Sequence, residues 1–236
     1  MSQKKKQIER YHLERFISND NLGLIVYNIK EDETPDFSLK LKDKLVSVEH
    51  TRLVNPDLQQ KEQYKDKIIK EAQKLFEEKY DEKLYVLITF QEDVLQLGIK
   101  NQRKYVKHVF DFVEQIFLNN QNFEFHIYSK LSEETTEFIE GVNINNRDNF
   151  SHWQHFGAYS VDQIDKDWFK GIIHKKEQNI SNYNGTFDEN WLLLVSDFGT
   201  EASTKSFYGF DFSEITTQFD KIYLYSYMPD NITVVK

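Results

Sequence analysis

The chain has 236 residues, enough for one good-sized domain or two small ones, and its hydrophobic content of 39% and aromatic content of 15% allow a real core. Gly (8) and Pro (3) are scarce, which predicts long regular elements rather than a loop-rich scaffold. The absence of Cys excludes disulfides and thiolate metal sites. The net charge of -9 argues against a protein that coats nucleic acid through Lys and Arg, but a nuclease stays open because local charge matters more than the sum.

Nothing in the sequence indicates a membrane protein. No apolar run approaches the roughly 20 residues that a membrane-spanning helix needs. The N-terminal sequence MSQKKKQIERYHLERF is basic but lacks the apolar stretch of a signal peptide. We therefore expect a cytoplasmic protein with no membrane partner.

Hydrophobic periodicity divides the chain into helices and strands. Residues 36–41 and 44–51 alternate between apolar and polar side chains, and the KDK sequence between them fits a hairpin connection. Asn55 followed by Pro56 is typical of a helix start. The expected helices cover residues 3–18, 55–80, 103–120 and 161–183, and the expected strands cover residues 22–29, 36–41, 44–51, 84–90, 123–129, 137–146, 191–197 and 220–227.

The order of these elements predicts a single α/β domain over residues 1–236, with a central mixed β-sheet flanked by helices. No internal repeat, linker or low-complexity segment divides the chain. The aromatic residues of KIYLYSYM near the C-terminus, taken as lying on an exposed strand, are compatible with a homodimer.

Two carboxylates stand where core strands usually have other residues. Asp36 follows Pro35 at the start of one strand and Glu49 lies late in the next, so a hairpin can bring them together. Two carboxylates a few ångströms apart repel, and one takes up a proton unless a cation sits between them. Mg²⁺, or Mn²⁺ in its place, suits this position because it is a hard cation held by one or two carboxylates with water.

Simpler roles stay open for the same residues. Asp36 can be a turn or strand-start residue, and Glu49 can face solvent on an edge strand. His50 falls on the face of its strand opposite Glu49. His152 and His155, spaced i, i+3 in an aromatic-rich segment, can share a metal on a helix face, or they can pack with aromatic rings in a loop or short helix.

The order of a helix, a strand, the PD strand, the strand of VEHT, a long helix and a further strand resembles the PD-(D/E)XK nuclease superfamily. The resemblance covers residues 8–90, and the PDF…EHTRL and WLLLV segments are similar to those of uncharacterised bacterial proteins. It implies a restriction-endonuclease-like core in which Asp36 and Glu49 bind Mg²⁺. A Glu of the first helix often joins them, and here Glu14 is the first choice and Glu9 the second.

The sequence departs from the family pattern at the lysine. Thr51 stands two residues after Glu49, where the family has a Lys. Some members supply that lysine from another element, and the candidates are Lys175 and Lys176. The resemblance further suggests substrate-binding roles for Gln178 and Tyr183, and Arg52 can contact a phosphate.

The sequence therefore predicts a Mg²⁺-dependent phosphodiester hydrolase that acts on DNA or RNA. The alternative is a catalytically inactive module of the same fold that binds protein or nucleic acid, which Thr51 and the acidic composition favour. A lysine ammonium group near the two carboxylates would separate the two hypotheses in favour of the hydrolase. The third hypothesis is an unrelated α/β domain that binds a small ligand.

Overall fold

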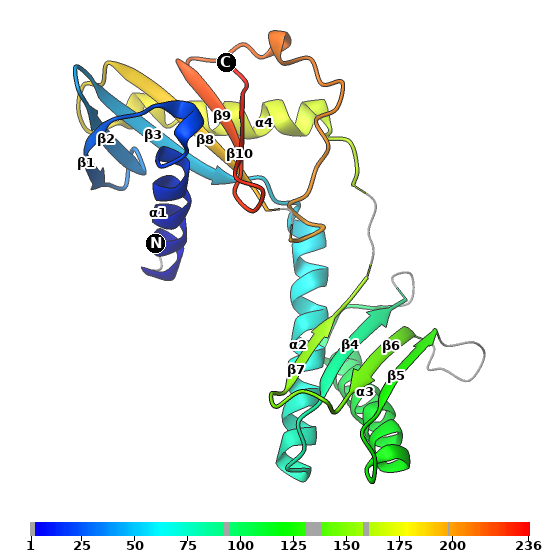
Figure 1. Ribbon diagram of the computed structural model, residues 1–236. Helices are drawn as coiled ribbons and strands as arrows, with labels where there is room; N and C mark the ends of the chain where they lie inside the picture. The colour runs from blue at the N-terminus through cyan, green and yellow to red at the C-terminus, as the bar shows by residue number, and fades with distance from the viewer. Residues whose placement is uncertain (1–2, 92–94, 131–137, 158–160, 198) are drawn as a thin grey trace. The chain divides into compact units, whose positions relative to one another are not determined.

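The computed structural model describes residues 3–91, 95–130, 138–157, 161–197 and 199–236. The chain divides into two compact units (Figure 1). The terminal unit joins Met1–Asn55 with Ser160–Lys236, and the middle unit is Pro56–Tyr159. Within the described ranges, no helix has both the length and the apolar character that crossing a membrane requires.

The terminal unit is built on a six-stranded sheet in the order β1-β2-β3-β8-β9-β10. Its three middle strands β3, β8 and β9 run parallel, and the pairs β1–β2, β2–β3 and β9–β10 are antiparallel. The elements are α1 (Gln3–Ile17), β1 (Val26–Glu31), β2 (Phe37–Leu41), β3 (Leu45–Arg52), α4 (Lys166–Glu177), β8 (Glu189–Ser196), β9 (Lys221–Ser226) and β10 (Asn231–Val234), with short 3-10 turns at Asp20–Leu22, Ile180–Asn182 and Phe212–Glu214.

Two separate apolar clusters show that α1 and α4 cover opposite faces of this sheet. Leu13 and Phe16 of α1 pack with Leu193 of β8. Phe169 of α4 packs with Leu192, the residue that precedes Leu193 in the same strand. Successive residues of a strand point to opposite faces. The near-continuous apolar run of β8 is therefore explained by a strand that is buried on both sides.

The middle unit has a four-stranded sheet in the order β5-β6-β4-β7. Ile68 and Phe76 of α2 and Val109 of α3 share one core cluster with Val86 and Ile88 of β4, so both helices pack on the same face. Pro56 begins α2, as the sequence indicates. The elements are α2 (Pro56–Lys79), β4 (Tyr85–Phe90), α3 (Ile99–Asn120), β5 (His126–Lys130), β6 (Ile139–Asn145) and β7 (His152–His155).

The α/β class is confirmed, but the strands form two sheets where the sequence predicts one. The expected second helix and the strand at 84–90 belong to the middle unit and not to the sheet of Asp36 and Glu49. A local pattern identifies a strand, but its partners depend on contacts distant in sequence. The aromatic rings of Tyr223 and Tyr225 are buried rather than exposed as expected.

Several element boundaries also differ from expectation. The strand expected at 22–29 starts at Val26, because the preceding residues form a 3-10 turn that ends at Gly23 with a φ of 56°. The helix expected over 161–183 covers only Lys166–Glu177. Strands β7 and β10 are not expected from the sequence, and residue 137 of the strand expected at 137–146 lies outside the described residues.

Leu193 is 1% exposed and lies in the cluster between α1 and the sheet. Leu193→Ala is expected to lower the free energy of unfolding by about 2–5 kcal/mol, because it removes buried apolar area and leaves a cavity. Val234→Ala, at a side chain that is 61% exposed, is the control and should change it by less than about 0.5 kcal/mol. Urea unfolding measures both, and equal effects would contradict the placement of Leu193.

Candidate functional site

The β2–β3 hairpin brings Asp36 and Glu49 together. Phe37 pairs with Val48 in antiparallel register, so the residues just beyond them, Asp36 and Glu49, lie opposite each other. Their exposed fractions are only 5% and 2%. The backbone N–H of His50 donates a hydrogen bond of 2.9 Å to Oδ2 of Asp36. The hairpin therefore fixes two buried carboxylates at one place.

Lys176 of α4 extends to both carboxylates. Its Nζ lies 2.8 Å from Oε2 of Glu49 and 3.6 Å from Oδ2 of Asp36. Burial acts to lower the pKa of Lys176, but the carboxylates of Glu49 and Asp36 outweigh it and leave that pKa above its ordinary value. The side chain is therefore a protonated ammonium group at neutral pH.

The pKa of the Glu49 carboxyl also lies above its ordinary value. Burial raises its pKa and the charge of Asp36 adds to this, whereas Lys176 acts in the opposite direction. The net shift is upward because burial, the largest effect, outweighs the opposing charge and hydrogen bond of Lys176.

The first helix contributes Glu9 and Lys6. Glu9 is 4% exposed, and burial, followed by the charge of Asp36, raises its pKa. Nζ of Lys6 lies 3.6 Å from Oδ1 of Asp36 and 3.9 Å from Oε2 of Glu9. Within the described residues, Oε2 of Glu9 has no hydrogen-bond partner. Glu9 is thus a third buried acid beside Asp36.

Glu14, the first choice from the sequence, lies elsewhere on α1. Its carboxylate is exposed and pairs with Nε of Arg10 at 2.6 Å. The buried positions of α1 are Glu9, His12, Leu13 and Phe16, which share one helix face. Glu14 falls outside that face, and Glu9, which shares Lys6 with Asp36, is the acid of α1 at the site.

Tyr183 reaches the site from the turn that follows α4. Burial raises its pKa above the ordinary value, and the carboxylates of Glu49 and Asp36 raise it further. Its hydroxyl is buried and lies close to the side chains of Glu49 and Ser47. The phenol therefore stays protonated, with its O–H donor beside the carboxylates.

The other residues expected at the site lie outside the carboxylate cluster. Lys175 is exposed, and Gln178, also exposed, caps the end of α4. The guanidinium group of Arg52 lies 3.9 Å from Oδ2 of Asp197. Of the predicted residues, the structure brings together Asp36, Glu49, Lys176 and Tyr183.

A pair of buried histidines lies on the opposite face of β3, as alternation along the strand predicts for His50. Nδ1 of His12 and Nε2 of His50 are 3.1 Å apart, and the rings stack with centroids 5.3 Å apart. Burial lowers the pKa of His12 to about 4, and Arg52 acts in the same direction. Both rings are neutral at pH 7, so one donates a hydrogen bond and the other accepts it. Helical spacing from Phe16 was the signal in the sequence for a buried His12, but it gave no indication of the pairing with His50.

The histidines of the middle unit do not form the metal patch considered from the sequence. They lie on strand β7 rather than on a helix, so their spacing places them on opposite faces of the sheet. His152 stacks on Tyr85 with ring centroids 5.4 Å apart. Nδ1 of His155 lies 3.0 Å from Oδ1 of Asp66.

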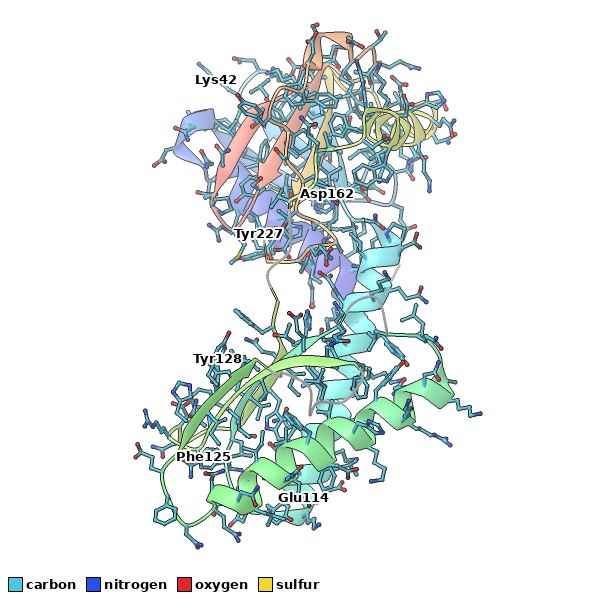
Figure 2. The ribbon with its side chains drawn as sticks, turned by 90° about the vertical axis from the view of Figure 1, so that its right-hand side faces the viewer. Lys42, Glu114, Phe125, Tyr128, Asp162 and Tyr227 are labelled. Carbon is cyan, nitrogen blue, oxygen red and sulfur yellow. The ribbon has the colours of Figure 1, made fainter. Side chains whose placement is uncertain are left out.

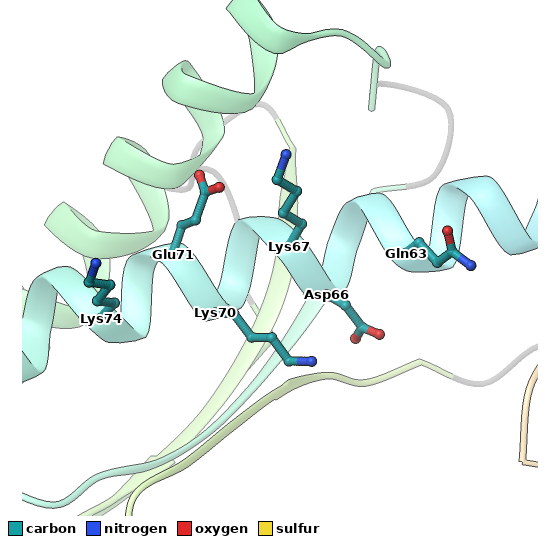
Figure 3. Close-up of a pocket in the computed structure, with 6 residues that line it drawn as sticks. All are labelled: Gln63, Asp66, Lys67, Lys70, Glu71 and Lys74. Carbon is teal, nitrogen blue, oxygen red and sulfur yellow. The ribbon is translucent and has the colours of Figure 1, made fainter. Parts of the chain in front are cut away.

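A hollow of about 440 Å³ along α2 is lined by lysines and acids of that helix. Lys67 and Lys70 extend from different sides of the helix (Figure 3). Asp66 pairs with His155, and both carboxylate oxygens of Glu71 accept hydrogen bonds from Gln102. The lysines that line this hollow are interspersed with acids and do not point toward one place, as a phosphate-binding site would require.

The oxygen atoms of Asp36 and Glu49 fit a hard divalent cation. Mg²⁺ is usually held by one or two carboxylates together with water and substrate phosphates. No cluster of three or more His, Asp or Glu in the described part of the chain is arranged to hold a metal ion. The two carboxylates, with Glu9 next to Asp36, nevertheless provide buried oxygen donors of the kind that such an ion prefers.

Comparison with family models, with curated proteins and with solved structures finds no match to this chain. The geometry of Asp36, Glu49 and Lys176 is therefore the basis for assigning a function. These three side chains come from a hairpin and a helix that are far apart in the sequence, yet they meet within hydrogen-bond and ion-pair distances.

The buried acid of α1 predicts a pH effect on stability. Because the pKa of Glu9 is raised in the folded state, this carboxyl binds more protons in the folded protein than in the unfolded chain, and its contribution to stability falls as the pH rises from 4.5 through the folded-state pKa. Glu9→Gln should remove up to about 1.4 kcal/mol per pH unit of this dependence. Urea unfolding at several pH values measures it, with the exposed Glu14→Gln as control. An unchanged slope in Glu9→Gln would contradict the burial of a titrating Glu9.

Proposed function

We propose that the protein is a Mg²⁺-dependent phosphodiester hydrolase acting on DNA or RNA, with its active site in the terminal unit. The observation that carries this proposal is the ammonium group of Lys176, 2.8 Å from Glu49 and 3.6 Å from Asp36. Thr51 leaves the family's lysine position without a positive charge. A helix lysine at the two carboxylates supplies that charge.

The order of elements in the terminal unit supports the resemblance to the PD-(D/E)XK nucleases. Helix α1, strands β1, β2 and β3, helix α4 and strand β8 follow in the helix–strand–strand–strand–helix–strand order of that superfamily. The long helix and the last strand of the pattern are then α4 and β8. The middle unit, Pro56–Tyr159, lies in the sequence between β3 and α4 as an insertion.

In the proposed hydrolase, Asp36 and Glu49 would hold Mg²⁺, with Glu9 as a third acid. When bound, Mg²⁺ would polarise the phosphate and lower the pKa of an attacking water. Lys176 is held protonated by its neighbours, so it serves as a fixed positive charge for the phosphate or hydroxide rather than as a base. The protonated hydroxyl of Tyr183 adds a hydrogen-bond donor.

The same contacts suggest a second candidate function. Lys176 already neutralises part of the charge of Asp36 and Glu49, so the three residues can act as a buried ion-pair network without any metal. In that case the terminal unit would be an inactive module of the nuclease fold that binds nucleic acid or protein. Metal-dependent cleavage separates the two functions.

Substitution of Lys176 should strongly reduce the rate of cleavage. Lys176→Met is expected to reduce Mg²⁺-dependent hydrolysis of plasmid DNA and single-stranded RNA by about 10²-fold or more, because it removes the fixed charge. Lys175→Met, at the exposed neighbouring position, is the control and should retain the rate. Circular dichroism verifies folding, and Lys176→Arg tests whether charge alone restores activity. Equal rates in the two Met variants would exclude this role for Lys176.

Metal binding should depend on the two hairpin carboxylates. Calorimetry is expected to detect Mg²⁺ or Mn²⁺ binding at millimolar concentration to the wild type and its loss in Asp36→Asn combined with Glu49→Gln, because the charged oxygen donors are gone. The control is Glu14→Gln, which removes an exposed acid of α1. Binding that survives in the double variant would place the metal elsewhere.

A further inference from the structure

The sheet of the middle unit has one face packed against α2 and α3 and a second face rich in aromatic and amide side chains. Val86 and Ile88 of β4 are buried toward the helices, so the alternating residues Tyr85, Leu87 and Thr89 lie on the other face. Cross-strand register adds Tyr128 and Asn143 at the level of Leu87, with His126 and Asn145 at the level of Tyr85.

Several aromatic rings on this side are available to a partner. Tyr128 is 69% exposed and Phe156 is 58% exposed. Tyr128 lies on the side of the sheet away from α3 (Figure 2). The backbone N–H of Phe156 donates a 2.8 Å hydrogen bond to the carbonyl of Ile88, which fixes Phe156 just beyond the end of β7 and beside β4. One exposed ring is thus held on edge strand β5, and the other lies just beyond the end of β7 at the opposite edge of the sheet.

A pocket of about 270 Å³ lies on this face, between the rings of Tyr128 and Phe156. Leu87, Thr89 and Gly141 contribute to its lining, and Gly141 has no side chain to fill it. Asn143 and Glu140 supply polar groups. The pocket therefore combines a flat apolar surface with a carboxylate and an amide.

A β-bulge places the carboxylate of Glu140 there. Thr89 pairs with Gly141 and the next residue, Phe90, pairs with Ile139, so Glu140 is an extra residue in β6. Strict alternation from Asn143 would turn Glu140 toward the helix-covered face. A bulge changes the direction of a side chain and is over-represented next to functional sites. Here it brings the one acid of the pocket lining to a position with aromatic rings and an amide.

We propose that this pocket binds an amino-bearing base of a single-stranded nucleic acid. Every base has a flat aromatic face that stacks on rings such as those of Tyr128 and Phe156. The carboxylate of Glu140 accepts a hydrogen bond from an exocyclic amino group, and the amide of Asn143 can both donate and accept. In a duplex the bases are stacked and paired, so only an unpaired base enters the pocket.

The charge of the pocket determines how strongly the binding of a nucleic acid depends on salt concentration. Its described lining holds Glu140 and no Lys or Arg, and the whole chain has a net charge of -9. Binding by stacking with few phosphate contacts releases few counterions, so its salt dependence is shallow. This site lies in the middle unit, and its existence does not rest on the hydrolase activity proposed for the terminal unit.

Fluorescence anisotropy of labelled 12-mers tests the proposal with the full chain in EDTA, which separates binding from any metal-dependent cleavage. The wild type is expected to bind oligo-dC more tightly than oligo-dT by about fivefold or more, because thymine lacks the amino group. It should bind a duplex of the same length far more weakly. Tyr128→Ala and Phe156→Ala should each weaken oligo-dC binding by about tenfold.

Variants inside and outside the pocket distinguish binding in the pocket from nonspecific binding. Glu140→Ala should narrow the difference in affinity between oligo-dC and oligo-dT, since it removes the oxygens that accept the hydrogen bond. Phe123→Ala removes a ring that is 73% exposed in the same unit but outside the pocket lining, and it should bind as the wild type does. No binding by the wild type at 100-micromolar order protein, or equal losses in Phe123→Ala and Tyr128→Ala, would overturn the proposal.

Discussion

The candidate active site depends on the ion-pair contacts that the ammonium group of Lys176 makes with Glu49 and Asp36. The two carboxylates are almost fully buried, and without a cation their repulsion would force one of them to take up a proton. Their hairpin and the helix that carries Lys176 lie far apart in the sequence. Removal of one partner from such a buried network typically costs about 3–5 kcal/mol, so the contact also ties α4 to the sheet.

The same network determines the charges at the site and therefore which chemistry it can support. Burial and mutual repulsion raise the pKa of Glu49 and of Glu9, whereas the acids together keep Lys176 protonated. The site thus combines a fixed positive charge with buried acidic oxygens, which are the donors that a hard divalent cation prefers. Site residues reach this point from both sides of the sheet, because Lys6 and Glu9 belong to α1 and Lys176 belongs to α4.

Local pattern was enough to predict the carboxylate pair, because a hairpin of known register determines which residues face each other. Lys176 was predicted because Thr51 leaves a charge to be supplied from elsewhere. The sequence ERYHLERF does not show which face of α1 is buried, so Glu9 was ranked below Glu14. In the structure the buried face of α1 contains both Glu9 and His12. The division into two sheets could not be predicted, since the apolar runs at 84–90 and 191–197 look alike until their partners are known.

A double-mutant cycle on metal-dependent hydrolysis tests the central claim most directly. The rates of wild type, Asp36→Asn, Lys176→Met and the double variant would be measured on one single-stranded and one plasmid substrate in Mg²⁺. Residues that act as a unit are strongly non-additive, so the double variant should be about as slow as each single one. Losses that simply multiply, or a wild type without metal-dependent hydrolysis, would contradict the joint role of Asp36 and Lys176 in catalysis.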